Sequence, residues 1–233
     1  MILEVCCADL ESARAAALAG APRIELCTDL DADGLTPSAD VLQAARQLPS
    51  LLVHVLIRPR AGDFVYNAAE ADVIEQQLCT ALGIGADGVV IGALTSSGAI
   101  DVALCRRLLK HVDACRAAGR HVACTFHRAF DHAIQPPLEA LDDLIDLGFT
   151  HLLTSGRQPT AQEGIPLLRS LVSHAAGRIT IIPASGITPA NARLVIDATD
   201  ATQIHGSLRA LQSDGMMHSD VNLIRQTLLT LCP

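Results

Sequence analysis

The stretch Thr125–Asp131, with the sequence TFHRAFD, predicts both the fold of this 233-residue chain and the place of its functional site. It ends an apolar run, 121–126, which is typical of a buried strand. The segment Gln135-Pro136-Pro137 follows, where a helix is expected to begin. A histidine, an arginine and an aspartate therefore share one strand-to-helix turn. In parallel α/β proteins such turns lie at the carboxyl edge of the sheet, where ligands bind.

The same strand-and-helix unit recurs along the chain. Strands are expected at 2–6, 23–27, 51–57, 87–91, 121–126, 150–154, 178–182 and 201–205. Helices are expected at 12–19, 37–47, 69–82, 101–117, 136–147, 165–175, 189–198 and 219–229. Eight such units predict an α/β fold in which residues 1–233 form a single-domain (β/α)8 TIM barrel. A doubly wound open sheet is the alternative, but the chain has no Gly-x-Gly-x-x-Gly turn.

Composition excludes several classes of partner. The net charge is −8, aromatic residues make up only 2% of the chain, and Lys110 is the single lysine, so no nucleic-acid partner is expected. No run of 18 apolar residues predicts a membrane span, and the first residues do not resemble a signal peptide. A cytoplasmic location is therefore expected, with the eight cysteines mostly reduced.

The first two strands carry matching polar positions on one face. Glu4 alternates with Cys6, and Glu25 alternates with Cys27, so each glutamate shares a face with a cysteine. If these faces point into the barrel, two carboxylates are buried there and need cationic partners. Arg58, at the end of the third strand, is expected to pair with one of them. A structural ion-pair layer and a functional role are equally compatible with this pattern.

A polar loop after the third strand is expected to fold over the mouth of the barrel. It contains Arg60, Asp63, Phe64 and Tyr66, the only tyrosine of the chain. Aromatic residues in such a loop, in a chain with few of them, favour a role in covering a ligand. An ordinary surface loop is the other interpretation.

In the opening stretch, His127 is expected to point into the mouth, since it shares a face with Thr125. Arg128 follows it directly. Asp131 is expected either to orient the imidazole or to pair with an arginine. A histidine on an apolar strand is often only structural, but the charged neighbours favour a functional site.

Small residues follow the last three strands. Ser155 and Gly156 follow the sixth strand, Ser185 and Gly186 the seventh, and His205 ends the eighth. In many barrels these turns bind a phosphate group. The cysteines at 79, 105, 115, 124 and 232 are expected to serve only in packing.

Six segments of the chain together resemble the CutC family, whose members are known as copper homeostasis proteins. They are EVC (4–6), RIELC (23–27), GLTPS (34–38), IRPRAGDFVY (57–66), TFHRAFD (125–131) and LTSG (153–156). The blocks IRPR and FHRAFD are the most specific, while 183–186 and 205–207 follow the general pattern with substitutions. The resemblance implies a cytoplasmic TIM barrel, usually a homo-oligomer, that binds and traffics copper.

Two functions follow for the barrel mouth. Cu(I) is a soft ion that prefers thiolates, so Cys6 and Cys27 are its expected ligands, and no organic cofactor is expected. The alternative is an enzyme that acts on a small polar or anionic metabolite. Its catalytic residues would be Glu25, His127 and Asp131, with a glutamate or His127 as the general base, and the arginines would hold an oxyanion or a carboxylate.

Overall fold

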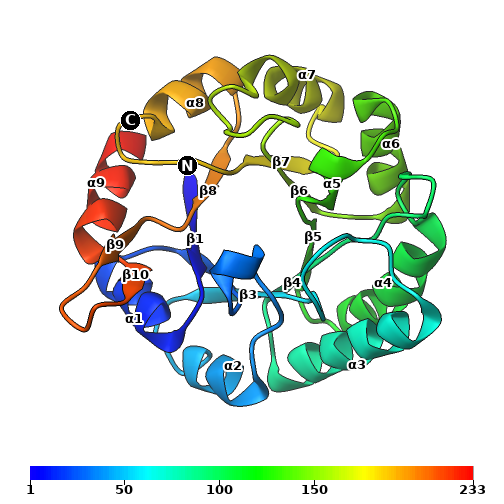
Figure 1. Cartoon of the computed structure of the whole chain (residues 1–233), viewed down its shortest axis with the longest axis horizontal. Helices are drawn as coiled ribbons and strands as arrows, with labels where there is room; N and C mark the ends of the chain where they lie inside the picture. Colours follow the sequence, from blue (N-terminus) through cyan, green and yellow to red (C-terminus); the bar gives the residue numbers. More distant parts are fainter. Residues whose placement is uncertain (233) are drawn as a thin grey trace.

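Eight parallel strands form a nearly closed barrel in the computed structural model, which describes residues 1–232 (Figure 1). The strands are β1 (Ile2–Cys7), β2 (Arg23–Leu26), β3 (Leu52–Leu56), β4 (Gly88–Ile91), β5 (Ala123–Phe126), β6 (His151–Thr154), β7 (Thr180–Pro183) and β8 (Gln203–Gly206). Hydrogen bonds join them in the order β7-β6-β5-β4-β3-β2-β1-β8. The (β/α)8 TIM barrel predicted from the sequence is therefore confirmed.

Helices surround this barrel as a ring (Figure 1). They are α1 (Leu10–Ala19), α2 (Ala39–Ala45), α3 (Ala68–Ile84), α4 (Val102–Ala117), α6 (Pro137–Leu147), α7 (Ile165–Ala175), α8 (Ala192–Thr199) and α9 (Val221–Leu231). Their ends follow local sequence signals. Asn67 and Glu70 form a capping box at the start of α3, and Gly85 ends that helix in a left-handed conformation.

Side chains alternate along each strand, so that one set packs outward against the helices and the other set points into the barrel. Outward side chains such as Leu3, Ile24 and Phe126 are fully buried against the helices. Inward side chains form smaller apolar groups, one of which joins Cys6 and Cys27 to side chains of β3 and β4. Because strand residues alternate, the outward position of Phe126 directs His127 to the interior.

The structure also contains elements that the sequence did not predict. A short helix, α5 (Ala129–His132), forms within the opening stretch, and a 3-10 helix, η1, covers Leu30–Ala32. The strands β9 (Arg209–Leu211) and β10 (Met217–Ser219) form an antiparallel hairpin before α9. These elements are too short for a hydrophobic period to appear in the sequence.

None of the helices described within residues 1–232 combines the length and apolar character needed to cross a bilayer.

Candidate functional site

A buried polar cluster fills the interior of the barrel on the side of β1, β2 and β8. The Oε2 atom of Glu4 lies 2.6 Å from Nε of Arg23 and 3.4 Å from Nδ1 of His54. Its Oε1 atom lies 2.9 Å from Nδ1 of His205. Arg23 also donates a hydrogen bond of 2.5 Å to Gln203. We call these five residues the polar base.

Charges in the polar base are set by burial and by the neighbouring groups. Burial acts to raise the pKa of Glu4, but Arg23, His205 and His54 outweigh it and hold that pKa well below its usual range. Burial acts to lower the pKa of His205, but Cys6, Glu4 and Glu25 hold it well above its usual range. Glu4 is therefore a carboxylate that pairs with cationic groups, as buried charges require.

Beside the polar base, three groups that can bind a metal converge. Ligand atoms of Cys6, Glu25 and His205 all lie within 4.8 Å of one another, and all three residues are buried. The Sγ atom of Cys27 lies 3.8 Å from that of Cys6. Since Glu4 engages Nδ1 of His205, Nε2 is the imidazole atom left for a ligand. Histidines that bind metals are oriented by carboxylates in this way.

The metal-binding group of Cys6, Glu25 and His205 holds protons when no ligand is bound, because the pKa of each residue is raised. The hydrogen bond to Cys27 and burial raise the pKa of Cys6 well above its usual range. Burial raises the pKa of Glu25 to about 7, the charge of Glu4 adds to this, and His205 and Arg23 oppose it. Cys6 is therefore a neutral thiol at neutral pH, and a metal must displace its proton.

A covering loop lies over the two thiols. Leu30, in the short helix η1, packs on the apolar group that contains Cys6 and Cys27, and η1 is drawn over the inside of the ring in Figure 1. Gly34, at φ +84°, comes so close that a Cβ there would lie 2.9 Å from Leu56. The close approach and the positive φ both require glycine at this position.

Arg58 holds this loop instead of pairing with a glutamate, so the sequence prediction of that pair is wrong. Its Nη1 donates to the carbonyls of Ala32 (2.7 Å) and Gly34 (3.0 Å), and its Nη2 to the carbonyl of Gly62 (2.8 Å). Arg23 is the partner of Glu4. Its alternation with Glu25 on β2 places both on the inner face, and this signal could have identified it.

On the opposite side of the barrel, at the end of β5, His127 is buried and neutral. Burial, and then the charge of Arg58, lower its pKa to about 3. Its Nδ1 accepts a hydrogen bond of 3.1 Å from the N–H of Ala129. The ring lies over Gly92, where a Cβ would come within 2.5 Å of it. Phe64 covers it with a ring-centroid distance of 4.9 Å.

Asp131 pairs with an arginine and does not orient the imidazole. Arg128 lies 3.0 Å from its Oδ2 atom. The same carboxylate accepts hydrogen bonds from the hydroxyl of Thr154, the N–H of Ser155 and the N–H of Arg157. Asp131 therefore connects the turns after β5 and β6, and its role is structural.

The polar loop after β3 carries two aromatic side chains that are partly buried, Phe64 and Tyr66, and the hydroxyl of Tyr66 is itself buried. Phe64 lies against the ring of His127. Arg60 is partly exposed and pairs with Asp63 (3.0 Å) and Glu70 (2.5 Å). Its guanidinium lies over the ring of Tyr66. Arg60 and Asp63 thus stabilise the loop from outside, away from the polar base.

The small residues of the later turns serve their own loops. The N–H of Ser155 donates to Asp131, its hydroxyl donates to the carbonyl of Gln158, and the hydroxyl of Ser185 donates to the carbonyl of Pro159. Gly156 and Gly186 both adopt φ +69°. Phosphate binding at these turns stays a prediction.

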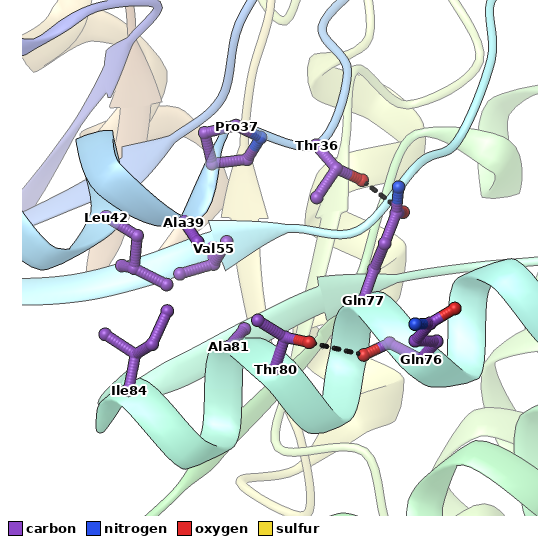
Figure 2. A pocket seen from close by; sticks show the side chains of 10 residues that line it. All are labelled: Thr36, Pro37, Ala39, Leu42, Val55, Gln76, Gln77, Thr80, Ala81 and Ile84. Atoms are coloured by element: carbon purple, nitrogen blue, oxygen red, sulfur yellow. Dashed lines mark hydrogen bonds between the residues drawn. The ribbon is translucent and has the colours of Figure 1, made fainter.

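A separate crevice of about 210 Å³ lies outside the barrel, between α2 and α3 (Figure 2). Leu42, Val55 and Ile84 form its apolar part, and Thr36 and Gln77 are hydrogen-bonded at its edge. Val55 points outward from β3, since its neighbour His54 points inward to the polar base. The crevice is therefore not connected to the site.

Comparison with known proteins places this chain in a family. The model of the CutC family matches residues 1–210. The chain belongs to the CutC family. It is 43% identical over 215 residues to the human "Copper homeostasis protein cutC homolog", covering 92% of this chain and 76% of the human protein. It is also 43% identical over 212 residues to a CutC family protein of Agrobacterium fabrum, covering 91% of this chain and 80% of the relative.

Solved structures agree. The crystal structure of the putative copper homeostasis protein CutC from Streptococcus agalactiae has a TM-score of 0.82 and 32% identity, and the match covers 89% of this chain and 98% of that one. A thiamine phosphate pyrophosphorylase from Pyrococcus furiosus, with 20% identity and a TM-score of 0.61, shares the fold alone.

Membership of the CutC family directs attention to the cysteines. Cys105 and Cys124 are buried in the outer core, as predicted for packing residues. Cys79 and Cys232 are exposed, so their prediction as packing residues is wrong. Only Cys6 and Cys27, among the residues described, bring two buried sulfur atoms within 4 Å of each other.

Proposed function

We propose that this CutC-family chain binds one Cu(I) ion inside the barrel, through the thiolates of Cys6 and Cys27 and the imidazole of His205. The separation of 3.8 Å between the two sulfur atoms carries the proposal. At a metal–sulfur distance of roughly 2.3 Å, it corresponds to an S–metal–S angle of roughly 110°. That angle suits a three- or four-coordinate ion and requires a further ligand.

His205 supplies the third ligand. It belongs to the group whose ligand atoms lie within 4.8 Å of Cys6 and Glu25. Glu4 accepts a hydrogen bond from Nδ1–H, so Nε2 can present its lone pair to the ion once the ion has displaced the Nε2 proton. Two sulfur ligands and one nitrogen ligand match the preference of a soft monovalent ion. Glu25, a hard ligand beside the site, is the group that a harder divalent ion would use instead.

The family supports the choice of copper. The human relative is named a copper homeostasis protein, and the residues of the proposed site lie within the segment 1–210 that matches the family. A reducing compartment keeps both the thiols and cuprous copper available, so the proposal includes a cytoplasmic location. It also includes assembly as a homo-oligomer, which the resemblance to the family implies.

Anaerobic titration of the reduced protein with Cu(I), against a competing chromophoric chelator, tests the proposal. We expect one ion per chain at high affinity, and loss of that site in the double variant Cys6→Ser, Cys27→Ser. The matched control is Cys79→Ser with Cys232→Ser, which removes two exposed thiols and should leave binding unchanged. Unchanged affinity in the first variant, or lost affinity in the control, contradicts the proposed site.

A single substitution tests the third ligand. His205→Ala should weaken Cu(I) binding while leaving one ion per chain, because two thiolates remain. X-ray absorption should then lose the nitrogen scatterer from the copper spectrum. If the spectrum of the wild-type protein shows sulfur alone, His205 is not a ligand.

A further inference from the structure

Arg58 is a buried cation, and no carboxylate within residues 1–232 neutralises it. Its side chain belongs to a residue only 3% exposed, and its hydrogen bonds within residues 1–232 all go to backbone carbonyls. Arg23, equally buried, is instead neutralised by Glu4 at 2.6 Å. Since a buried charge without a counterion is costly, the two arginines call for different explanations.

Three buried donor groups near Arg58 also have no acceptor within the described chain. They are Nε of Arg58 itself, the hydroxyl of Tyr66 and Nε2 of His127. The ring of Phe64 connects two of them, since it lies 4.9 Å from the Arg58 guanidinium carbon and 4.9 Å from the His127 ring. The Arg58 charge also acts on the pKa of both Tyr66 and His127. Buried groups of this kind are commonly satisfied by a bound ion, ligand or water, and the positive charge of Arg58 favours an anion.

His127 is a donor at this place because its tautomer is fixed. Its Nδ1 accepts the N–H of Ala129 at 3.1 Å, so the lone pair is on that nitrogen. Burial keeps the ring neutral, and its single proton is therefore on Nε2. A neutral imidazole held in this way is suited to donate to a carbonyl or carboxylate oxygen.

We propose that the mouth of the barrel binds a small oxyanion, the carboxylate or phosphate group of a metabolite, between Arg58, Tyr66 and His127. All three groups donate, and one is a permanent cation, so the site rejects metal ions and accepts an anion. Phe64 packs against both the guanidinium of Arg58 and the ring of His127. The proposed oxyanion site is distinct from the two thiols, because Cys6 lies in β1 and Cys27 directly follows β2.

Titration of the metal-free protein with sodium phosphate and with sodium acetate tests the proposal, with chloride at matched ionic strength as reference. The readouts are calorimetry and the ¹⁵N shift of His127 Nε2. We expect saturable binding of one oxyanion and a shift of His127 but not of His151, which belongs to the other end of the barrel at the start of β6. Saturation by phosphate alone identifies a phosphate ester as the ligand class, and saturation by acetate identifies a carboxylate.

The decisive variant is Tyr66→Phe, which removes one hydroxyl and keeps the ring. It should weaken binding roughly three- to tenfold, the effect of one hydrogen bond. Arg58→Gln should abolish binding, while Arg14→Gln is the matched control, because Arg14 is exposed and pairs with Glu11 on the outer surface. Removal of both thiols, Cys6→Ser with Cys27→Ser, should leave oxyanion binding intact.

Two results overturn the proposal. One is the absence of saturable binding of either oxyanion above the chloride reference. The other is binding that persists unchanged in both Tyr66→Phe and Arg58→Gln, which identifies an adventitious ion only. Because Tyr66→Phe keeps the hydrogen bonds of Arg58 to the carbonyls of Ala32, Gly34 and Gly62, its result holds even where Arg58→Gln fails to fold.

Discussion

Glu4→Gln tests whether the polar base is an ion-pair cluster on which the fold depends. The substitution keeps the shape of the side chain and removes the charge that neutralises Arg23. The side chains of Glu4 and Arg23 are 1% and 5% exposed, so Arg23 would remain as a buried charge without a partner. Removing one member of a buried pair costs about 3–5 kcal/mol. In a chain of this length each kcal/mol shifts the melting temperature by roughly 2–4 °C, so we expect a decrease of roughly 6–20 °C.

The effect should depend on pH in a defined direction. The folded-state pKa of Glu4 lies well below the model-compound value of 4.5. The carboxylate therefore contributes its full stabilisation above about pH 4.5, and the contribution is lost as the pH falls through the lower, folded-state pKa. Urea unfolding of the wild-type protein and of Glu4→Gln should accordingly differ most at neutral pH and converge in acid.

The matched control is Asp197→Asn, which breaks the exposed pair of Arg193 and Asp197. It should leave the unfolding midpoint almost unchanged, because solvent screens exposed pairs. Adding Arg23→Met to Glu4→Gln should recover part of the lost stability, since the orphaned charge is removed. If Glu4→Gln is as stable as the wild-type protein at neutral pH, the cluster does not stabilise the fold as an ion pair.

Two further predictions concern the neighbouring groups. Since the pKa of Glu25 is about 7 in the folded chain, against 4.5 as the ordinary value, its stabilising effect is full below about pH 4.5 and lost by pH 7. The free energy of unfolding of Glu25→Gln should therefore rise by up to about 3 kcal/mol, relative to that of the wild-type protein, between pH 5 and pH 8. If urea unfolding gives the same difference between the two proteins at both pH values, this prediction is contradicted. Gly92→Ala should displace His127, since a Cβ there lies 2.5 Å from the imidazole, and should remove the Nε2–H signal from ¹⁵N spectra. Its control is Gly83→Ala in α3, where a Cβ meets nothing within 4 Å; an unchanged His127 signal in Gly92→Ala would refute the predicted displacement.

The barrel and the inward faces of its strands could be predicted from the sequence because both depend on local periods. Alternation alone placed Glu4, Cys6, Glu25 and Cys27 in the interior, and the structure confirms that they are buried. Short β-branched runs followed by helical patterns were sufficient to place eight strands.

Pairing between strands could not be predicted in the same way. The choice of Arg23 over Arg58 as the partner of Glu4 depends on register, because Glu4 lies opposite Arg23 in the ladder between β1 and β2. His205 lies opposite Glu4 across the ladder between β8 and β1. Arg58 instead donates its hydrogen bonds to backbone carbonyls of two loops. The conformations of these loops depend on tertiary packing, and the composition of the sequence does not predict them.

This position of Arg58 links the two proposed sites. Its Nη atoms hold the loop at 32–34 that covers Cys6 and Cys27, while its Nε faces the proposed oxyanion. An anion that neutralises the guanidinium lowers the cost of burying it, and so stabilises the closed loop over the thiols. Binding of the anion and retention of copper should therefore favour each other, and by linkage each must raise the affinity of the protein for the other. A permanent cation that closes one site and forms part of the second is sufficient for this coupling, without any movement of the barrel itself.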